Sequence, residues 1–433
     1  MPFRALHLDP LIAKAVEETG YTTPTPIQAG AIPKILAGKD VIGVAQTGTG
    51  KTAAFTLPLL SRLAEITSGG GPKVTRALIL APTRELVVQI EENIRVYGKH
   101  LKLRIATVFG GVGERPQIEA LRSGADIVIA TPGRLIDLMG QGHHQFQKLA
   151  FLVLDEADRM LDMGFLPPIR QIVKGLPKQR QTLLFSATLS PEIEKISAEF
   201  LTKPETVAIG NRTRTADTVT QSIYEVPRHL KSNLLSHLLK SAQLESVLVF
   251  SRTKHGADRI TRKLAREGIT AAAIHGNRSQ PQRLRALNDF KEGKIRVLVA
   301  TDIAARGIDV DGISHVINYD FPKTTDDYIH RIGRTGRAEA TGDAISFIGE
   351  DEHDLLKVLE RFIGRAIPRV IATDFNYSAA APANDNSVRP PRRPDAGGAQ
   401  QQRGGGGGGG GGGGSNPGRP AARGARRSTN RGR

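Results

Sequence analysis

The chain contains 433 residues, of which 39% are apolar and 24% are charged. These fractions are typical of globular domains and exclude a chain that is disordered throughout. At a usual domain size of about 150 residues the length suggests three units. The last stretch is too poor in apolar residues to form one, which leaves two. The formal net charge of +17 favours a polyanionic partner, and nucleic acid before a membrane surface.

The sequence contains no cysteine. This excludes disulfides, thiolate zinc sites and a cysteine nucleophile, fits a reducing compartment, and means that metal ligation would have to be oxygen-based. Asp9 interrupts the N-terminal stretch where a secretory signal would be apolar, and no run of about eighteen apolar residues follows. We therefore expect a soluble, cytoplasmic protein without membrane association.

Short apolar runs rich in β-branched residues recur along the chain. We predict strands over 40–45, 77–81, 104–109, 126–130, 151–154 and 182–185, and then over 247–250, 271–274, 297–300, 315–317 and 344–348. The runs are apolar on both faces, and helical patterns separate many of them, as the strands of a covered parallel sheet require. The sequence therefore predicts an α/β protein with two tandem, doubly wound parallel-sheet domains.

Composition divides the chain further. A leader over 1–30 precedes a first domain over 31–209, and a polar linker over 210–219 leads to a second domain over 220–377. From 378 to 433 the composition falls to Ala, Pro, Asn, Arg and Gly, so we expect a disordered basic tail. The tail is either a solvated spacer or a flexible tether that holds a polyanion near the domains. Because nearly all of its charged residues are Arg, and so have the same sign, the tether is favoured.

A phosphate-binding loop follows the first predicted strand, over residues 45–52. Thr47, Gly48, Thr49 and Gly50 can direct backbone N–H groups at a phosphate from the start of a helix. Lys51 supplies a charge for the β and γ phosphates, and the Thr52 hydroxyl is placed for Mg²⁺. A glycine-rich turn alone would be an ordinary turn, but Lys-Thr between a strand and a helix favours the phosphate site.

Acidic residues end the apolar run over 151–154. Asp155 would hold Mg²⁺ through its water shell, and Glu156 is the natural group to orient and deprotonate an attacking water. An acidic cluster after a strand is by itself more often a solvated loop. Behind a phosphate-binding loop, the catalytic interpretation is favoured.

Motifs of one family now follow in order: residues 20–28, 45–52, 82–86, 110–111, 131–134, 155–158 (Asp-Glu-Ala-Asp), 186–188, 249–253, 280–283, 300–302 with 305–309, and 330–337. Over residues 1 to about 377 the chain closely resembles the DEAD-box ATP-dependent RNA helicases. The resemblance implies RecA-like domains, a Q-motif leader, and ATP and Mg²⁺ as ligands. Residues 161–165, the short leader and the Arg/Gly tail look most like the bacterial RhlE-type branch.

We expect Gln28 to select adenine, because its side-chain amide offers both a donor and an acceptor to the edge of the base. The resemblance implies that Tyr21 stacks on the base, that Thr23 adds backbone contacts and that Phe3 supports the pocket. It also implies ribose contacts from Gly307 and Asp309.

Two arginines of the second domain, Arg334 and Arg337, are expected to reach the γ phosphate across an interdomain cleft. Hydrolysis would then require the domains to close. The alternative is that both are surface arginines paired with carboxylates. Asp158, Ser186, Thr188 and His330 would, by resemblance, couple hydrolysis to strand separation, although Ser186 and Thr188 would equally suit a helix cap.

RNA contacts are expected from loops that follow strands and offer N–H groups, hydroxyls and arginines to a phosphodiester chain. The first-domain set is Pro82, Thr83, Arg84, Gly110, Gly111, Thr131, Gly133 and Arg134, and the second-domain set is Arg252, Thr253, Gln280, Arg283, Thr301 and Arg306. Each loop alone would be an ordinary turn. Because none suits reading of base edges in a groove, we expect largely sequence-independent recognition of RNA through its 2′-hydroxyls.

The expected function is therefore an ATP-dependent RNA helicase, an RNA-stimulated ATPase that unwinds short duplexes or remodels RNA–protein complexes. A DNA translocase and a non-enzymatic RNA clamp are the competing interpretations. The intact Lys51, Glu156 and Arg334 argue against the clamp. Ribosomal particles and RNA-decay proteins are candidate partners, and no residue chooses among ribosome assembly, decay and cold adaptation or fixes an oligomeric state.

Deletion of residues 379–433 tests the tether. This segment carries ten Arg and two Asp, so its loss should lower RNA affinity and flatten the salt dependence of binding, because fewer phosphates are neutralised. The RNA-saturated ATPase rate should not change. RNA titrations at several salt concentrations check the first expectation, and an unchanged affinity would make the tail a spacer.

Overall fold

The computed structural model describes residues 2–46, 48–67, 74–143, 146–209, 219–240, 244–305, 313–336 and 342–380. The chain divides into two units, Met1–Ala383 and Asn384–Arg433, and every described residue lies in the first. This unit contains two parallel sheets. We call the part built on the first sheet domain 1 (2–209) and the part built on the second sheet domain 2 (219–380).

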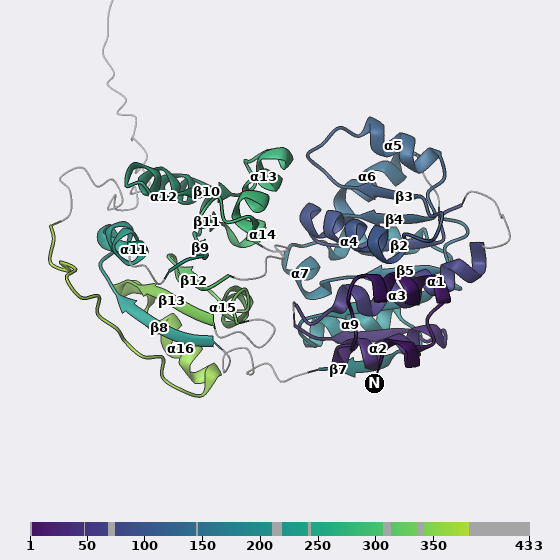
Figure 1. The fold of residues 1–433 in the computed structure, drawn as a ribbon, viewed down its shortest axis with the longest axis horizontal. Helices are drawn as coiled ribbons and strands as arrows, with labels where there is room; N and C mark the ends of the chain where they lie inside the picture. Colours follow the sequence, from purple (N-terminus) through teal and green to yellow (C-terminus); the bar gives the residue numbers. More distant parts are fainter. Residues whose placement is uncertain are drawn as a thin grey trace, which may run out of the picture. The chain divides into compact units, whose positions relative to one another are not determined.

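Domain 1 has a seven-stranded sheet in the order β3-β4-β2-β5-β6-β1-β7 (Figure 1). Its strands are β1 (Val41–Val44), β2 (Ala77–Leu80), β3 (Ile105–Val108), β4 (Ile127–Ala130), β5 (Phe151–Leu154), β6 (Gln181–Ser186) and β7 (Glu205–Ala208). Its helices are η1 (Phe3–Leu6), α1 (Pro10–Glu18), α2 (Pro26–Leu36), α3 (Lys51–Thr67), α4 (Arg84–Tyr97), α5 (Arg115–Arg122), α6 (Pro132–Gly140), α7 (Ala157–Asp162), α8 (Leu166–Lys174) and α9 (Pro191–Phe200).

Domain 2 has a six-stranded sheet in the order β10-β11-β9-β12-β13-β8. Its strands are β8 (Val219–Glu225), β9 (Val247–Phe250), β10 (Ala271–Ile274), β11 (Val297–Ala300), β12 (His315–Asn318) and β13 (Gly342–Ile348). Its helices are η2 (Arg228–Leu230), α11 (Lys231–Leu239), α12 (Lys254–Arg266), α13 (Gln280–Lys291), α14 (Asp302–Ala305), α15 (Thr325–Ile332), η3 (Glu350–Glu352) and α16 (His353–Ile363).

Consecutive residues of the central strands serve two different cores. In β2, Ile79 packs in the core under α2, α3 and α4, whereas Leu78 and Leu80 pack in the core under α6, α8 and α9. A strand that is buried on both faces must be apolar at every position, which is why the sequence shows runs rather than alternation. The predicted α/β class with two parallel sheets is confirmed.

Two edge strands were not predicted from the sequence. In β7 only one of four residues is buried, and β8 alternates between buried and more exposed positions. Because an edge strand has one partner and one partly solvated face, it lacks the uniform apolar run that marks a central strand. Val219, in the expected linker, is the first residue of β8, while residues 210–218 lie outside the described part.

Beyond α16 the chain returns across domain 2. Residues 364–380, which we call the strap, pair with the edge strand β8 through a parallel bridge between Ile223 and Arg369. The ring nitrogens of His237 and His229 then lie 2.9 and 2.8 Å from the carbonyl oxygens of Thr373 and Ala379. The predicted tail follows directly, and residues 381–433 lie outside the described part.

Within the described ranges, every helix is too short or too polar to cross a lipid bilayer.

Gly43 provides a test of packing in the domain 1 sheet. A Cβ at this position would overlap the Phe185 ring on the neighbouring strand β6. Gly43→Ala should therefore lower the free energy of unfolding by about 1–3 kcal/mol, measured by urea denaturation of the full chain. Gly140→Ala is the matched control, since no atom lies within 4 Å of a Cβ there. Equal stability of the two variants would contradict the packing described.

Candidate functional site

The phosphate-binding loop connects β1 to α3 at the carboxyl edge of the sheet. Gly48 and Gly50 have φ of 82° and 86°, values that glycine adopts without strain. Lys51 is the first residue of α3, and its buried Nζ donates a hydrogen bond of 2.7 Å to the carbonyl of Ala45. Burial lowers the pKa of Lys51, and the Asp155 carboxylate opposes that shift. Thr47 lies outside the described residues.

The amide of Gln28 connects the leader to this loop. Its Oε1 accepts a hydrogen bond of 2.9 Å from the Thr25 backbone N–H, and its Nε2 donates one of 3.2 Å to the Gly50 carbonyl. The side chain is buried. The side chain of Gln28 therefore connects the leader directly to the phosphate-binding loop. The residue type alone does not predict this contact.

Aromatic rings gather beside the leader. Tyr21 is 45% exposed and stacks on the buried Phe3 at a centroid distance of 6.3 Å. The centroid of the Tyr21 ring also lies 6.3 Å from that of the buried Tyr97 ring at the end of α4. Burial and the Tyr21 hydroxyl raise the pKa of Tyr97. Tyr97 lies in no motif and was not expected here from the sequence. Thr23, two residues after Tyr21, is exposed.

The acidic pair lies at the carboxyl end of β5. Asp155 is buried, and its Oδ1 accepts a hydrogen bond of 2.9 Å from the Glu156 backbone N–H. Burial, together with the Glu156 charge, raises the pKa of Asp155 to about 7. The charges of Lys51 and Arg159 oppose this shift. A carboxylate oxygen is the type of ligand that a hard divalent cation prefers.

Among the described residues no cluster of three or more His, Asp or Glu side chains could hold a metal ion. Mg²⁺ commonly takes one or two protein oxygens and completes its shell with phosphates and water. Asp155 and the half-buried Thr52, both beside the phosphate loop, match that pattern.

Glu156 forms a buried ion pair with Arg159. The guanidinium Nη1 lies 2.8 and 2.7 Å from the two carboxylate oxygens. Glu156 itself adopts the left-handed conformation, with φ 51° and ψ 49°. Arg159 was not expected from the sequence, although it directly follows the acidic motif.

The expected coupling residues Asp158 and Ser186 lie together in domain 1. The Asp158 Oδ2 accepts a hydrogen bond of 3.1 Å from the Ala187 backbone N–H, so α7 is tied to the end of β6. The Ser186 hydroxyl accepts one of 3.2 Å from the Thr188 N–H. The Ser186 bond is a local turn contact and not a helix cap, because Ser190 caps the following helix α9. The Asp158 bond instead joins two elements that lie 29 residues apart in the sequence.

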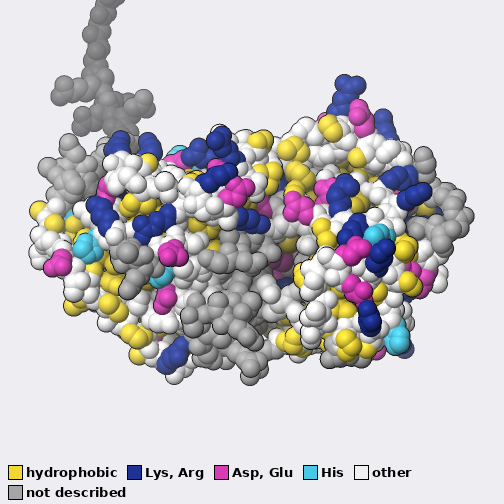
Figure 2. All heavy atoms as spheres, viewed as in Figure 1, with side chains coloured by type: hydrophobic (Ala, Val, Ile, Leu, Met, Phe, Trp, Pro, Cys, Tyr) yellow, Lys and Arg dark blue, Asp and Glu magenta, His cyan; other side chains and the backbone are white. Residues whose placement is uncertain are grey.

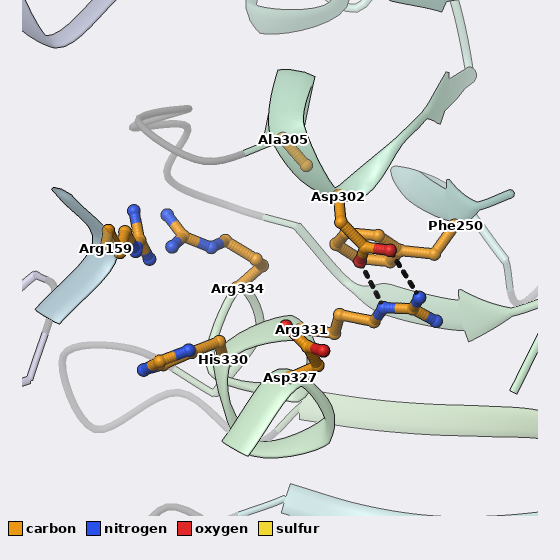
Figure 3. Close-up of a pocket in the computed structure, with 8 residues that line it drawn as sticks. All are labelled: Arg159, Phe250, Asp302, Ala305, Asp327, His330, Arg331 and Arg334. Carbon is orange, nitrogen blue, oxygen red and sulfur yellow. Dashed lines mark hydrogen bonds and ion pairs between the residues drawn. The ribbon is translucent and has the colours of Figure 1, made fainter. Parts of the chain in front are cut away.

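A pocket brings His330 and Arg334 of domain 2 toward Arg159 of domain 1 (Figure 3). Burial and the charges of Arg159 and Arg334 lower the pKa of His330 to about 3, so the imidazole is neutral at physiological pH. Three arginines, Arg159, Arg331 and Arg334, line the pocket together with the carboxylates of Asp302 and Asp327. The guanidiniums of Arg159 and Arg334 point toward each other (Figure 3), an arrangement that suits an anion between them. Arg337, Gly307 and Asp309 lie outside the described residues.

Arg331 also lines this pocket. It binds Asp302 through two contacts of 2.6 and 2.8 Å and stacks over the Phe250 ring at 4.9 Å. This residue links helices α14 and α15, and the sequence analysis had assigned it no role.

The expected RNA loops of domain 1 lie at one sheet edge. Thr83 caps α4 by accepting a hydrogen bond from the Leu86 N–H. Arg84 covers the next loop, because a Cβ at Gly111 would overlap its guanidinium. Gly111 therefore makes room for an arginine, whereas a Cβ at Gly110 would be in ordinary contact with it. Thr131, Gly133 and Arg134 lie at the start of α6, and Pro82 lies in the short connection between β2 and α4.

In domain 2, Arg252 and Thr253 are exposed and Thr301 is half-buried at the carboxyl ends of β9 and β11. Gln280 and Arg283 are instead buried against Glu85 of α4, at 3.1 and 2.9 Å. The structure thus places these two residues at a contact between the domains, and Glu85 is a further residue that the sequence analysis missed. Arg306 lies outside the described residues.

Basic side chains gather over α12 and α13 in domain 2 (Figure 2). Helix α12 contains Lys254, Arg259, Arg262, Lys263 and Arg266 within its thirteen residues. Such a surface suits a polyanion.

A phosphate loop and an acidic pair on one parallel sheet, followed by a second sheet that presents arginines, define a two-domain nucleotide-binding protein of the RecA-like class. Comparison with known families agrees. Residues 25–196 match the family described as DEAD/DEAH box helicase, and residues 230–339 match the family described as helicase conserved C-terminal domain.

Characterised relatives and solved structures extend the match. The chain is 45% identical over 360 residues to the ATP-dependent RNA helicase DeaD of Mycobacterium tuberculosis, covering 83% of this chain and 63% of that protein. It is 45% identical to the ATP-dependent RNA helicase RhlB of Pseudomonas syringae, covering 84% of this chain and 93% of that protein. A structure of S. cerevisiae Dbp5 bound to RNA and ADP BeF3 matches at 32% identity and a TM-score of 0.77, covering 85% of this chain and 95% of that one.

The chain belongs to the DEAD-box family of ATP-dependent RNA helicases, as the motifs predicted. It spans 63% of the length of the mycobacterial relative. The RhlE-type branch stays a prediction.

Gln28→Glu tests the link between leader and loop. The carboxylate can still accept from Thr25, but it loses the donor to Gly50 and faces a carbonyl oxygen instead. We expect the KM for ATP to rise about tenfold, as for a lost buried hydrogen bond, with reduced preference for ATP over GTP. Steady-state ATPase assays with both nucleotides measure this, and Gln141→Glu on the exposed surface is the charge-matched control. Unchanged KM and preference would contradict the assignment.

Proposed function

We propose that the protein is an RNA-stimulated ATPase that opens short RNA duplexes or remodels RNA–protein complexes. The observation that carries this proposal is a pocket that Arg334 of domain 2 lines together with Arg159 of domain 1, the residue whose guanidinium is paired with Glu156 of the acidic pair. The similarity to Dbp5 bound to RNA and ADP BeF3 supports it.

In this proposal each residue has one task at the nucleotide. The N–H groups of the loop and Lys51 bind the phosphates, and Glu156 accepts a proton from the water that attacks the γ phosphorus as the bond to the leaving ADP oxygen breaks. Arg334, and Arg337 by resemblance, neutralise the charge that develops on the transferred group. Thr52 and Asp155 would hold Mg²⁺, which when bound neutralises phosphate charge.

RNA would bind along the carboxyl edges of both sheets. Arg84, Arg252 and their neighbouring loops offer backbone and guanidinium donors suited to phosphates rather than base edges. Closure of the domains on ATP and RNA would bend one strand in a way that a duplex cannot follow, and phosphate release would reopen the cleft. Binding would then be largely independent of sequence.

The cellular setting is proposed from composition. A chain without cysteine suits a reducing compartment, and we place the protein in the cytoplasm. Ribosomal particles or RNA-decay proteins are the proposed partners.

The decisive experiment compares ATP hydrolysis with no nucleic acid, with RNA and with DNA of the same sequence. We expect multiple turnovers, stimulation by RNA and little stimulation by DNA. Equal stimulation by DNA would favour a DNA translocase, and absence of turnover would favour a passive RNA clamp.

Two substitutions separate binding from chemistry. Lys51→Ala should weaken ATP binding because it removes the phosphate charge. Glu156→Gln should keep ATP binding, slow hydrolysis by about 10²-fold or more, and trap a closed complex with RNA. Nucleotide titrations and single-turnover hydrolysis measure the two effects. Native hydrolysis by Glu156→Gln would remove Glu156 from the water-activating role.

A further inference from the structure

We infer that Arg159 is the positioning residue of Glu156, and that its guanidinium fixes the carboxylate that takes the proton from the attacking water. This inference rests on the proposed function, in which Glu156 activates that water. It assigns a role to a residue outside the acidic motif itself.

The contact is close and shielded from solvent. One nitrogen, Nη1, lies 2.8 Å from Oε1 and 2.7 Å from Oε2 of Glu156, and the side chains of Arg159 and Glu156 are 2% and 7% exposed. A buried ion pair contributes little net stability, because desolvation offsets the attraction. Its clearest effect here is to restrict the carboxylate to one orientation.

Glu156 needs such a restraint because its backbone does not provide one. It is a non-glycine residue in the left-handed region at the start of α7, and its side chain makes no capping bond with that helix. Asp155 is held by the Glu156 backbone N–H, whereas among the described residues Arg159 is the hydrogen-bond partner of the Glu156 carboxylate. Without it, the flexible side chain could turn toward the Lys51 charge.

The pair leaves Glu156 able to act as a base. A carboxylate has about four lone-pair sites, and the two contacts with Nη1 occupy two of them. The remaining sites can accept from a water molecule.

Arg159 is itself fixed at its backbone. Its N–H donates a hydrogen bond of 3.0 Å to Oδ1 of Asp158, whose Oδ2 accepts from Ala187. Its side chain lines the pocket with His330 and Arg334 (Figure 3). Arg159 thus joins the proton acceptor, the coupling carboxylate and the wall of the anion pocket, so a small displacement of this residue would move the base.

The test measures kcat and KM for ATP at saturating RNA for Arg159→Gln and Arg159→Lys in the full chain. Arg159→Gln should lower kcat about 10- to 100-fold, as expected for a misplaced catalytic group, and leave KM within about twofold of the native value. Arg159→Lys should recover part of the loss. The control is Arg170→Gln, which breaks an exposed Arg170–Glu199 pair in the same domain and should leave both constants unchanged.

A second arm excludes a merely structural role. In a Glu156→Gln background, Arg159→Gln should cause no further loss in single-turnover hydrolysis, because the base that Arg159 positions is already gone. An equal loss in both backgrounds would show that Arg159 supports the fold alone, and thermal unfolding of each variant identifies that case directly. A raised kcat for Arg159→Gln would show that the ion pair inhibits Glu156. An unchanged kcat would show that Arg159 has no role in hydrolysis. Each of these results overturns the inference.

Failure of this inference can be told from failure of the proposed function. If the native chain hydrolyses ATP and Glu156→Gln does not, the proposed function stands whatever Arg159→Gln does. If the native chain does not hydrolyse ATP, the proposed function fails first.

Discussion

The burial of both faces of each parallel sheet is the constraint on which the rest of the structure depends. Because helices cover the faces, polar chemistry can be placed only at the strand ends, and parallel strands end at one edge. Lys51, Asp155 and Ser186 come from three parts of the sequence and meet there for this reason. The same rule places Arg252 and Thr301 at the corresponding edge of domain 2.

The edge carries an unusual density of buried charge. Lys51, Asp155, Glu156 and Arg159 are all nearly inaccessible to solvent. Burial is the main cause of the raised pKa of Asp155 and of the lowered pKa of Lys51, and each of these two charges opposes the shift of the other. Charges that cannot be relaxed by water act strongly on whatever enters the site.

Sequence reasoning succeeded where a residue's environment follows from its neighbours in the chain. Central strands were predicted because burial on both faces demands continuous apolar runs. The edge strands β3 and β10 also have such runs and were predicted, whereas the edge strands β7 and β8 were missed because polar residues interrupt theirs. Asp155 and Lys51 could be assigned from motif and strand position alone. The partnership of Glu85 with Gln280 and Arg283 could not, because it joins residues about two hundred positions apart, and the contact of Arg159 with Glu156 depends on a backbone conformation that residue type does not encode.

The strap forms hydrogen bonds with the edge strand β8 of the domain 2 sheet. Unpaired N–H and C=O groups of a terminal strand invite pairing with another chain, and here Pro368 and Val370 exchange hydrogen bonds with Ile223 of β8 instead. The segment that leads toward the basic tail therefore also covers the middle of this edge strand. A chain that ended just after α16 would keep every motif and yet leave the backbone groups of Ile223 without these two hydrogen bonds.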